Sequence, residues 1–174
     1  MSSDWELETV ESRLGGAVQA YQASVDDFDR ELARLMGVNE TGLRCLEILL
    51  ATEEATPREL STRLGLTTGS VTTMLDRLEK LGCVTRTPHP TDRRKTLVRV
   101  TPDTAQRAYG LLAPFLDDAG RQVRTRYSAE QLELVADFLT FSQEIQQRHV
   151  HRLRELPSPH PGRTGGKQTP GPRA

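Results

Sequence analysis

The stretch TTGSVTTMLDRLEKLGCVTRTPHPTDRRKTLVRVT, residues 67–101, changes its hydrophobic period halfway along its length. Up to Gly82 its apolar side chains recur every three or four residues, which is the spacing of one face of an α-helix. These side chains are Val71, Met74, Leu75, Leu78 and Leu81. Beyond Gly82 the period is about two, which predicts strands at 83–86 and 96–100 with Pro88 in the loop between them. The stretch is therefore expected to form a helix followed by a β-hairpin.

A shorter helix is expected immediately before this stretch. The segment Thr56–Glu59 combines a capping threonine, a proline at the first helical position and a glutamate that closes a capping box. The helix would bury Leu60 and Leu64 and end at Gly65, and another helix capped by Asn39 would precede it. Two helices joined by a short turn that contains glycine are typical of a helix-turn-helix.

Long helices are predicted on both sides of this central region. An apolar stripe with steps of three and four residues runs from Leu7 to Leu35, and a helix of that length normally needs a partner along its whole stripe. Two closing helices are expected after the hairpin, the first with Pro114 inside it and the second opened by a capping box at Ser128. We therefore divide the chain into a long N-terminal helix, a central region with the helix-turn-helix and the hairpin, two C-terminal helices and a disordered basic tail rich in proline and glycine, at residues 1–38, 39–101, 102–155 and 156–174.

Positive charge is concentrated in the central region, although the whole chain has a formal net charge of −1. Residues 57–101 carry nine basic and four acidic side chains, a balance of +5. The last 19 residues hold three basic groups and no acid, which leaves −9 for the remainder. Such polarisation gives one surface a positive potential that attracts a polyanion.

The cysteine count and the apolar runs indicate the compartment. Two cysteines in 174 residues do not suggest a disulfide scaffold. The acidic start MSSDWELETVE has no apolar signal core, and no apolar run approaches the length of a membrane span. We therefore expect a soluble, cytoplasmic protein with no membrane partner.

The order of these features resembles the MarR-type winged helix-turn-helix transcription regulators. The resemblance covers about residues 5–153, and it rests on ELSTRLGL, TTGSVTTMLDRLEKLGCVTR and HPTDRRKTLVRVT together with the long helices on both sides. It implies a mainly α fold, in which long N- and C-terminal dimerisation helices flank a winged helix-turn-helix reading head with a two-stranded β wing. It also implies a triangular homodimer joined by the first and last helices. Many members of the family respond to small, often phenolic ligands, and some respond to cysteine oxidation.

The polar face of the helix at residues 67–81 is the predicted base-reading surface. Threonine offers a hydroxyl and a methyl, so it can hydrogen-bond a base or contact a thymine methyl. The first turns of a recognition helix meet base edges, and a glycine there allows close approach of the backbone. The alternative is a solvated polar face at the start of a helix. The candidate DNA-binding residues of this helix are Thr68, Gly69, Ser70, Thr72, Thr73 and Arg77.

The hairpin tip carries the other candidate DNA-binding residues, Arg93, Arg94 and Lys95. Such a tip can reach phosphates or insert a guanidinium into a narrow minor groove. The resemblance implies that Arg94 enters the minor groove and that Asp92 orients the wing. The downstream basic position of the family motif is Val98 here, so that part of the motif is missing. The alternative is a charged turn that keeps an edge hairpin soluble.

The remaining candidates favour no other chemistry. Cys45 and Cys83 stand at apolar positions, so we interpret them as core residues rather than redox sensors. His149 and His151 fall on different faces of a helix, which makes them poor joint metal ligands. The chain also has no phosphate-cradling glycine loop and no nucleophile elbow, so we expect no cofactor, no metal and no enzyme activity.

The sequence thus predicts a DNA-binding transcription regulator, a homodimeric repressor of a pseudo-palindromic site in double-stranded DNA. The resemblance further implies a small aromatic or phenolic effector. Two alternatives remain open. A metal-responsive repressor similar to the ArsR type would need paired cysteine or histidine ligands. A winged helix that binds protein would not need three consecutive basic residues in its wing. The operator, the regulated genes, the effector and the sign of regulation stay open.

Overall fold

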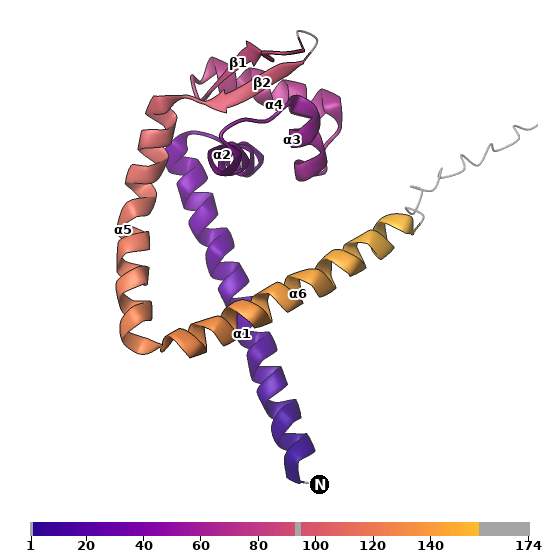
Figure 1. Cartoon of the computed structure of the whole chain (residues 1–174), viewed down its shortest axis with the longest axis vertical. Coiled ribbons are helices and arrows are strands. Elements are labelled where there is room, and N and C mark those ends of the chain that lie inside the picture. Colours follow the sequence, from indigo (N-terminus) through magenta and orange to yellow (C-terminus); the bar gives the residue numbers. More distant parts are fainter. Residues whose placement is uncertain (1, 93–94, 157–174) are drawn as a thin grey trace, which may run out of the picture. The chain divides into compact units, whose positions relative to one another are not determined.

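The computed structural model describes residues 2–92 and 95–156, and the side chains of 7–92 and 95–156. This described part forms α-helices and one two-stranded antiparallel sheet (Figure 1). The expected fold class, a mainly α winged helix-turn-helix with a two-stranded β wing, is confirmed. In chain order the elements are α1 (Ser2–Met36), α2 (Glu40–Thr52), α3 (Pro57–Leu64), α4 (Thr68–Lys80), β1 (Val84–Pro88), β2 (Thr96–Val100), α5 (Pro102–Arg126) and α6 (Ala129–Glu155).

The chain divides into two compact units, Met1–Ala119 and Gly120–Ala174. The first holds the helix-turn-helix, the hairpin and most of α5, and the second holds the end of α5 and all of α6. The proposed tail at 156–174 lies outside the described residues except for Leu156. No helix among the described residues has the length and apolar character needed to cross a membrane.

Side-chain caps begin the helices where the sequence predicts them. The Asn39 Oδ1 atom accepts a hydrogen bond from Gly42 N at 2.8 Å, at the start of α2. At the start of α3, Thr56 N donates to Glu59 Oε2 at 2.7 Å, and Glu59 N donates to Thr56 Oγ1 at 3.3 Å. Ser128 and Gln131 make the same reciprocal pair at the start of α6. These bonds satisfy backbone N–H groups that have no partner inside the helix.

The two capping boxes differ in charge, and this difference gives a prediction. The pKa of Glu59 is lowered, first by the backbone N–H of Thr56 and then by its hydroxyl. Because the pKa is lower in the folded state, the carboxylate stabilises the fold at every pH above its unfolded-state pKa of about 4.3. This stabilisation is lost as the pH falls through the folded-state pKa. Thr56→Ala should therefore cost about 1 kcal/mol at neutral pH and less in acid.

Ser128→Ala is the matched control for this prediction, because the neutral Gln131 closes its box. We expect its cost to stay constant with pH. Urea unfolding of the full chain near pH 7 and near pH 4 measures both variants. If the loss of unfolding free energy depends on pH equally in the two variants, the charge of Glu59 does not contribute to the stability of the capping box.

The first strand begins one residue later and ends two residues later than predicted. The strand expected at 83–86 is observed at Val84–Pro88, and Pro88 pairs with Thr96 instead of lying in the loop. The end of α4 explains the late start: Cys83 N donates to Leu78 O at 2.8 Å and Gly82 N donates to Glu79 O at 2.9 Å. These bonds form a Schellman motif, which requires the positive φ of +72° at Gly82. Cys83 is therefore part of the helix terminus.

The hairpin is fixed to the head on a second side. Ala55, in the loop between α2 and α3, exchanges two backbone hydrogen bonds with Val98 of β2 at 3.1 and 2.9 Å. Val98 pairs with Arg86 on its other side. The backbone of β2 is thus held from both edges at Val98, which fixes the base of the wing.

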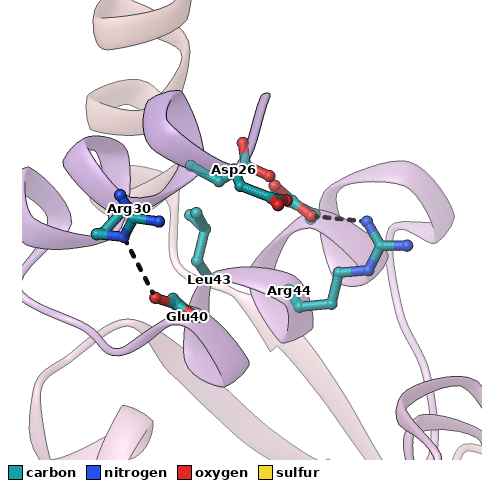
Figure 2. Close-up of a pocket in the computed structure, with 7 residues that line it drawn as sticks. Asp26, Arg30, Glu40, Leu43 and Arg44 are labelled. Atoms are coloured by element: carbon teal, nitrogen blue, oxygen red, sulfur yellow. Dashed lines mark hydrogen bonds and ion pairs between the residues drawn. The ribbon is translucent and has the colours of Figure 1, made fainter. Parts of the chain in front are cut away.

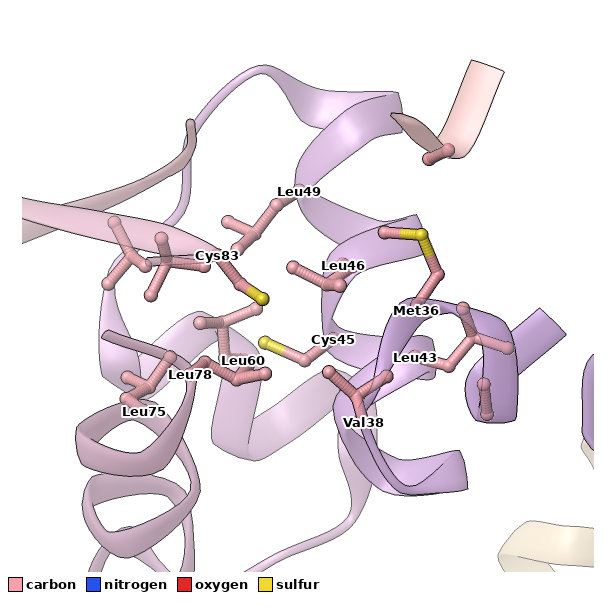
Figure 3. Packing of buried hydrophobic residues seen from close by; sticks show 14 of the residues in the cluster. Met36, Val38, Leu43, Cys45, Leu46, Leu49, Leu60, Leu75, Leu78 and Cys83 are labelled. Carbon is pink, nitrogen blue, oxygen red and sulfur yellow. The ribbon is translucent and has the colours of Figure 1, made fainter. Parts of the chain in front are cut away.

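The buried core is built mainly from α2, α3, α4 and the hairpin (Figure 3). Leu46 and Leu49 of α2, Leu60 of α3, Leu75 of α4 and Val98 of β2 are each at most 2% exposed. Elements that are far apart in sequence therefore share one apolar cluster, and the burial of this surface drives the head to fold.

The last turns of α1 belong to this core, but the rest of its stripe does not. Leu32 is 6% exposed, whereas Leu7 and Val10 are 60% and 55% exposed. Two contacts join α1 to α5: the rings of Phe28 and Phe115 lie 5.0 Å apart, and Arg107 donates to the carbonyl of Leu35 at 2.5 Å. Among the described residues, the N-terminal part of α1 therefore carries an apolar stripe that is largely exposed.

Candidate nucleic-acid interface

The core fixes which face of α4 points to solvent. Val71 and Leu75 are fully buried and Leu78 is 2% exposed, so the opposite side of the helix is exposed. The helix-turn-helix turn is also locked, because Leu66 N donates to Ser61 O at 3.1 Å and Ser61 Oγ donates to Leu66 O at 2.6 Å. The six residues that the sequence selects on α4 are all exposed: Thr68, Gly69, Ser70, Thr72, Thr73 and Arg77.

The first turn of α4 is held by its own cap. Thr67 Oγ1 accepts from Ser70 N at 3.2 Å and lies 2.9 Å from Ser70 Oγ. Ser70 is thus oriented by Thr67 before any partner arrives. A Cβ added to Gly69 would meet no atom within 4 Å, so nothing inside the described chain requires glycine at this position.

The two threonines of the second turn use their hydroxyl hydrogens within the helix. Thr72 Oγ1 donates to Thr68 O at 3.0 Å, and Thr73 Oγ1 donates to Gly69 O at 3.2 Å. A hydroxyl has one hydrogen, so each side chain offers a partner its acceptor lone pairs and its methyl group. These groups suit a cytosine or adenine amino group and a thymine methyl, respectively.

The wing turn is described up to its tip. His89 N donates to Lys95 O at 2.9 Å, and Lys95 N donates to Asp92 O at 2.8 Å. The Asp92 carboxylate lies 3.6 Å from the Lys95 ammonium, and both side chains are substantially exposed. Arg93 and Arg94 lie outside the described residues, so the roles expected of them remain predictions.

Several cations of the central region are already paired. Arg86 pairs with Asp76 and Glu79, and Arg99 pairs with Glu54. Other cations on α3 and α4 are exposed and form no ion pair within the described part: Arg58, Arg63, Arg77 and Lys80.

Arg58 and Arg63 of α3 are therefore available to phosphates. They contribute to the positive balance of residues 57–101, but the sequence does not single them out as candidate site residues. The signal that points to them is position, because the first helix of a helix-turn-helix crosses the DNA backbone.

A surface pocket of about 450 Å³ lies beside the exposed face of α4. Thr73 and Arg77 contribute to its wall, and Val38, Leu66 and Met74 make part of it apolar. A ligand in this pocket would cover residues of the candidate interface.

A second pocket, of about 430 Å³, lies between α1 and α2 (Figure 2). Its wall is charged, with Leu43 as its apolar contribution, and Arg30 lies 3.9 Å from Glu40 while Arg44 lies 3.3 Å from Glu47. Such a wall suits a polar ligand better than a phenol.

The cysteines have core environments. Cys45 is fully buried and Cys83 is 6% exposed, and neither forms a disulfide. Burial raises the pKa of the Cys45 thiol to about 11, which disfavours the reactive thiolate. His149 and His151 are exposed on α6, and no group of three or more metal-binding side chains occurs among the residues described.

Comparison with known proteins identifies relatives in sequence and solved structures with a similar fold. A family model described as the MarR family matches residues 31–96, from the last turns of α1 to the first residue of β2. The HTH-type transcriptional regulator YcgE of Bacillus subtilis (strain 168) is 34% identical over 130 residues, which cover 74% of this chain and 82% of that protein.

Two solved structures share the arrangement. The YusO protein from Bacillus subtilis has a TM-score of 0.57 at 22% identity, over 78% of this chain and 96% of its own. A mutant of MarR from E. coli complexed with operator DNA has a TM-score of 0.50 at 23% identity, over 75% of this chain and 95% of its own. At these identities the likeness concerns the fold.

Proposed function

Because this chain belongs to the MarR family and is a DNA-binding transcriptional regulator rather than an enzyme, we propose that it works as a homodimeric repressor. Each protomer would read one half of a pseudo-palindromic operator in double-stranded DNA. The observation that carries this proposal is the exposed polar row on α4, which is set over a fully buried apolar row. This arrangement leaves the polar row accessible to a major groove.

The roles of the site residues follow from their chemistry. Thr72 and Thr73 meet base edges with acceptors and methyl groups, and Arg77 contacts phosphate or a base. Arg94 enters the minor groove next to α4, where the potential is most negative. Arg58 and Arg63 add phosphate contacts from α3. The operator DNA in the E. coli MarR structure supports this docking by fold likeness.

The apolar surface of α6 supports the dimer. On a wheel of about 100° per residue, Val135, Leu139 and Leu153 fall within about 40° of one another, and Leu134 and Phe141 fall about 100–120° from Val135, on an adjoining part of one broad apolar face. These five side chains are 48%, 52%, 64%, 70% and 57% exposed, respectively, and no residue of α6 is buried. A helix with so broad an apolar face normally packs that face against other helices. A second copy, joined through α1 and α6, supplies those helices with two-fold symmetry.

The effector response is proposed on the family resemblance, and the pocket beside α4 is the more suitable of the two pockets. It combines apolar side chains with the Arg77 guanidinium, which suits an aromatic anion. An occupant would compete with DNA for Thr73 and Arg77.

Selection of bound sequences from random DNA by the full-length protein tests the proposal. We expect an enriched motif with two-fold symmetry and half-site centres about one helical turn apart. Failure to enrich any motif would reject the operator proposal, and enrichment of a single asymmetric half-site would reject the dimeric mode.

Thr72→Ala and Thr73→Ala should each change the selected motif. Each should also weaken binding to the operator selected by the wild type by on the order of 1–3 kcal/mol. Each substitution removes an outward methyl and an acceptor. Thr140→Ala on α6 is the matched control, because its hydroxyl makes the same bond to the carbonyl four residues back, at 2.9 Å. An unchanged motif in both α4 variants would mean that the reading face is misassigned.

A further inference from the structure

One guanidinium joins the recognition helix to the wing. Arg86 lies on β1, and its side chain crosses to α4. Arg86 NH1 lies 2.6 Å from Asp76 Oδ1 and 3.1 Å from Glu79 Oε2, and NH2 donates to the backbone carbonyl of Thr72 at 3.4 Å. The Arg86 side chain is 24% exposed, against 50% for Asp76 and 43% for Glu79.

The three acceptors are spaced so that one guanidinium restrains two turns of α4. Thr72 and Asp76 are four residues apart, and Asp76 and Glu79 are three apart, so the acceptors lie along one side of the helix. Thr72 also carries one of the proposed base-reading side chains. A planar guanidinium that bonds this carbonyl and two carboxylates opposes rotation of α4 about its own axis.

The apolar contacts between α4 and the hairpin set this rotation only coarsely. Val71, Leu75 and Val84 are buried and fix which face of α4 points inward. The hydrophobic effect is not directional, so these contacts resist a small rotation less sharply than a bonded guanidinium does. Because α4 turns about 100° per residue, a modest rotation would move Thr72 and Thr73 away from their base edges.

We propose that Arg86 is a specificity-determining positioning residue, which fixes the rotation of α4 relative to the wing so that both elements meet their grooves together. The inference rests on the proposed DNA-reading function of α4. Arg86 has a different role from Arg94 and Arg77, because its positive charge is already engaged by two carboxylates. It therefore acts on the DNA through α4.

Substitution separates this role from a phosphate contact. Arg86→Ala should weaken binding to the selected operator by about tenfold or more, because base contacts are misplaced in both protomers. Binding to random DNA should change by less than about twofold, and the dependence of log affinity on log salt should keep its slope. A direct phosphate contact instead predicts equal losses on both DNAs and a slope reduced by about one.

The acidic partners give a test with the opposite electrostatic sign. Asp76→Asn with Glu79→Gln removes two negative charges, so simple electrostatics predicts tighter binding to all DNA. Positioning predicts weaker operator binding with random-DNA binding unchanged or improved. In this background Arg86→Ala should have little further effect. Arg99→Ala is the control, because the carboxylate that pairs with Arg99 is Glu54, which lies between α2 and α3 and not on α4.

Each outcome leads to a distinct conclusion. If the wild-type protein enriches no motif, the proposed function fails. If it does enrich one and Arg86→Ala lowers both affinities equally with a reduced slope, Arg86 is a phosphate contact and the inference alone fails. Equal tightening of operator and random DNA in the Asp76→Asn, Glu79→Gln variant would also overturn it. Thermal unfolding of each variant, compared with the assay temperature, ensures that folded protein is measured.

Discussion

Glutamate in place of Leu139 and Leu153 on α6 should abolish the dimer and, with it, tight operator binding. The two side chains are 52% and 64% exposed in the single chain and lie on one face of the helix. In a symmetric interface each substitution occurs twice, so four apolar side chains are lost. Burying a whole leucine is worth about 1.5–3 kcal/mol, and roughly half of each side chain is still exposed, so the loss is roughly 3–6 kcal/mol, or at least about two orders of magnitude in association. Placing four carboxylates in the interface adds a further cost.

Thr140→Glu is the matched control for this double substitution. Thr140 lies on the same helix, in the polar arc opposite the broad apolar face, and its substitution adds the same charge as each leucine substitution. Sedimentation equilibrium should show a dimer for the wild type and the control at micromolar concentration, and a monomer for the double variant. If the wild type is a monomer and still binds a palindromic site tightly, the dimer proposal is wrong.

The wild type offers a second route to the same conclusion, in case the double variant does not fold. The melting temperature of an obligate dimer rises with protein concentration, because folding and association are linked. A concentration-independent melting temperature would contradict an obligate dimer without any substitution.

Local signals allowed most helix starts to be predicted. The caps at Asn39, Thr56 and Ser128 are read from sequence because donor and acceptor lie within three residues of each other. The hydroxyl bonds of Thr72 and Thr73 to carbonyls four residues back are equally local and follow from placing these residues inside a helix. Position on the helix also identified the exposed face of α4.

Contacts between distant residues were not predicted. Glu54 and Arg99 are 45 residues apart and Asp76 and Arg86 are 10 apart, so no periodic pattern signals either pair. The basic residues of 57–101 were therefore counted as one positive surface, although the structure shows Arg86 and Arg99 engaged by carboxylates. The bounds of β1 depend on how α4 ends and on pairing with β2, and both require the fold.

Arg94→Ala should weaken operator binding by about 1–3 kcal/mol per half-site, and therefore by about twice that across a dimer. It should also flatten the salt dependence, because fewer counterions are released per protein bound. Arg99→Ala removes the same charge from the hairpin, but Arg99 is paired with Glu54, so it serves as the control. If Arg94→Ala has no larger effect on operator binding than Arg99→Ala, the wing tip is only a charged turn and does not bind the minor groove.

Asp92 decides how the wing arginine works. Removing an acid near DNA should tighten all binding by simple electrostatics, whereas an orienting carboxylate predicts weaker operator binding with random-DNA binding unchanged or improved. Asp92 has Lys95 within 3.6 Å, but an exposed pair of this kind contributes little. We therefore expect Asp92→Ala to lose its effect in an Arg94→Ala background and to keep it in a Lys95→Ala background. Operator and random-DNA affinities, measured across a salt series for the single and double variants, test both expectations. If Asp92→Ala instead loses its effect in the Lys95→Ala background, the Asp92 carboxylate acts through Lys95.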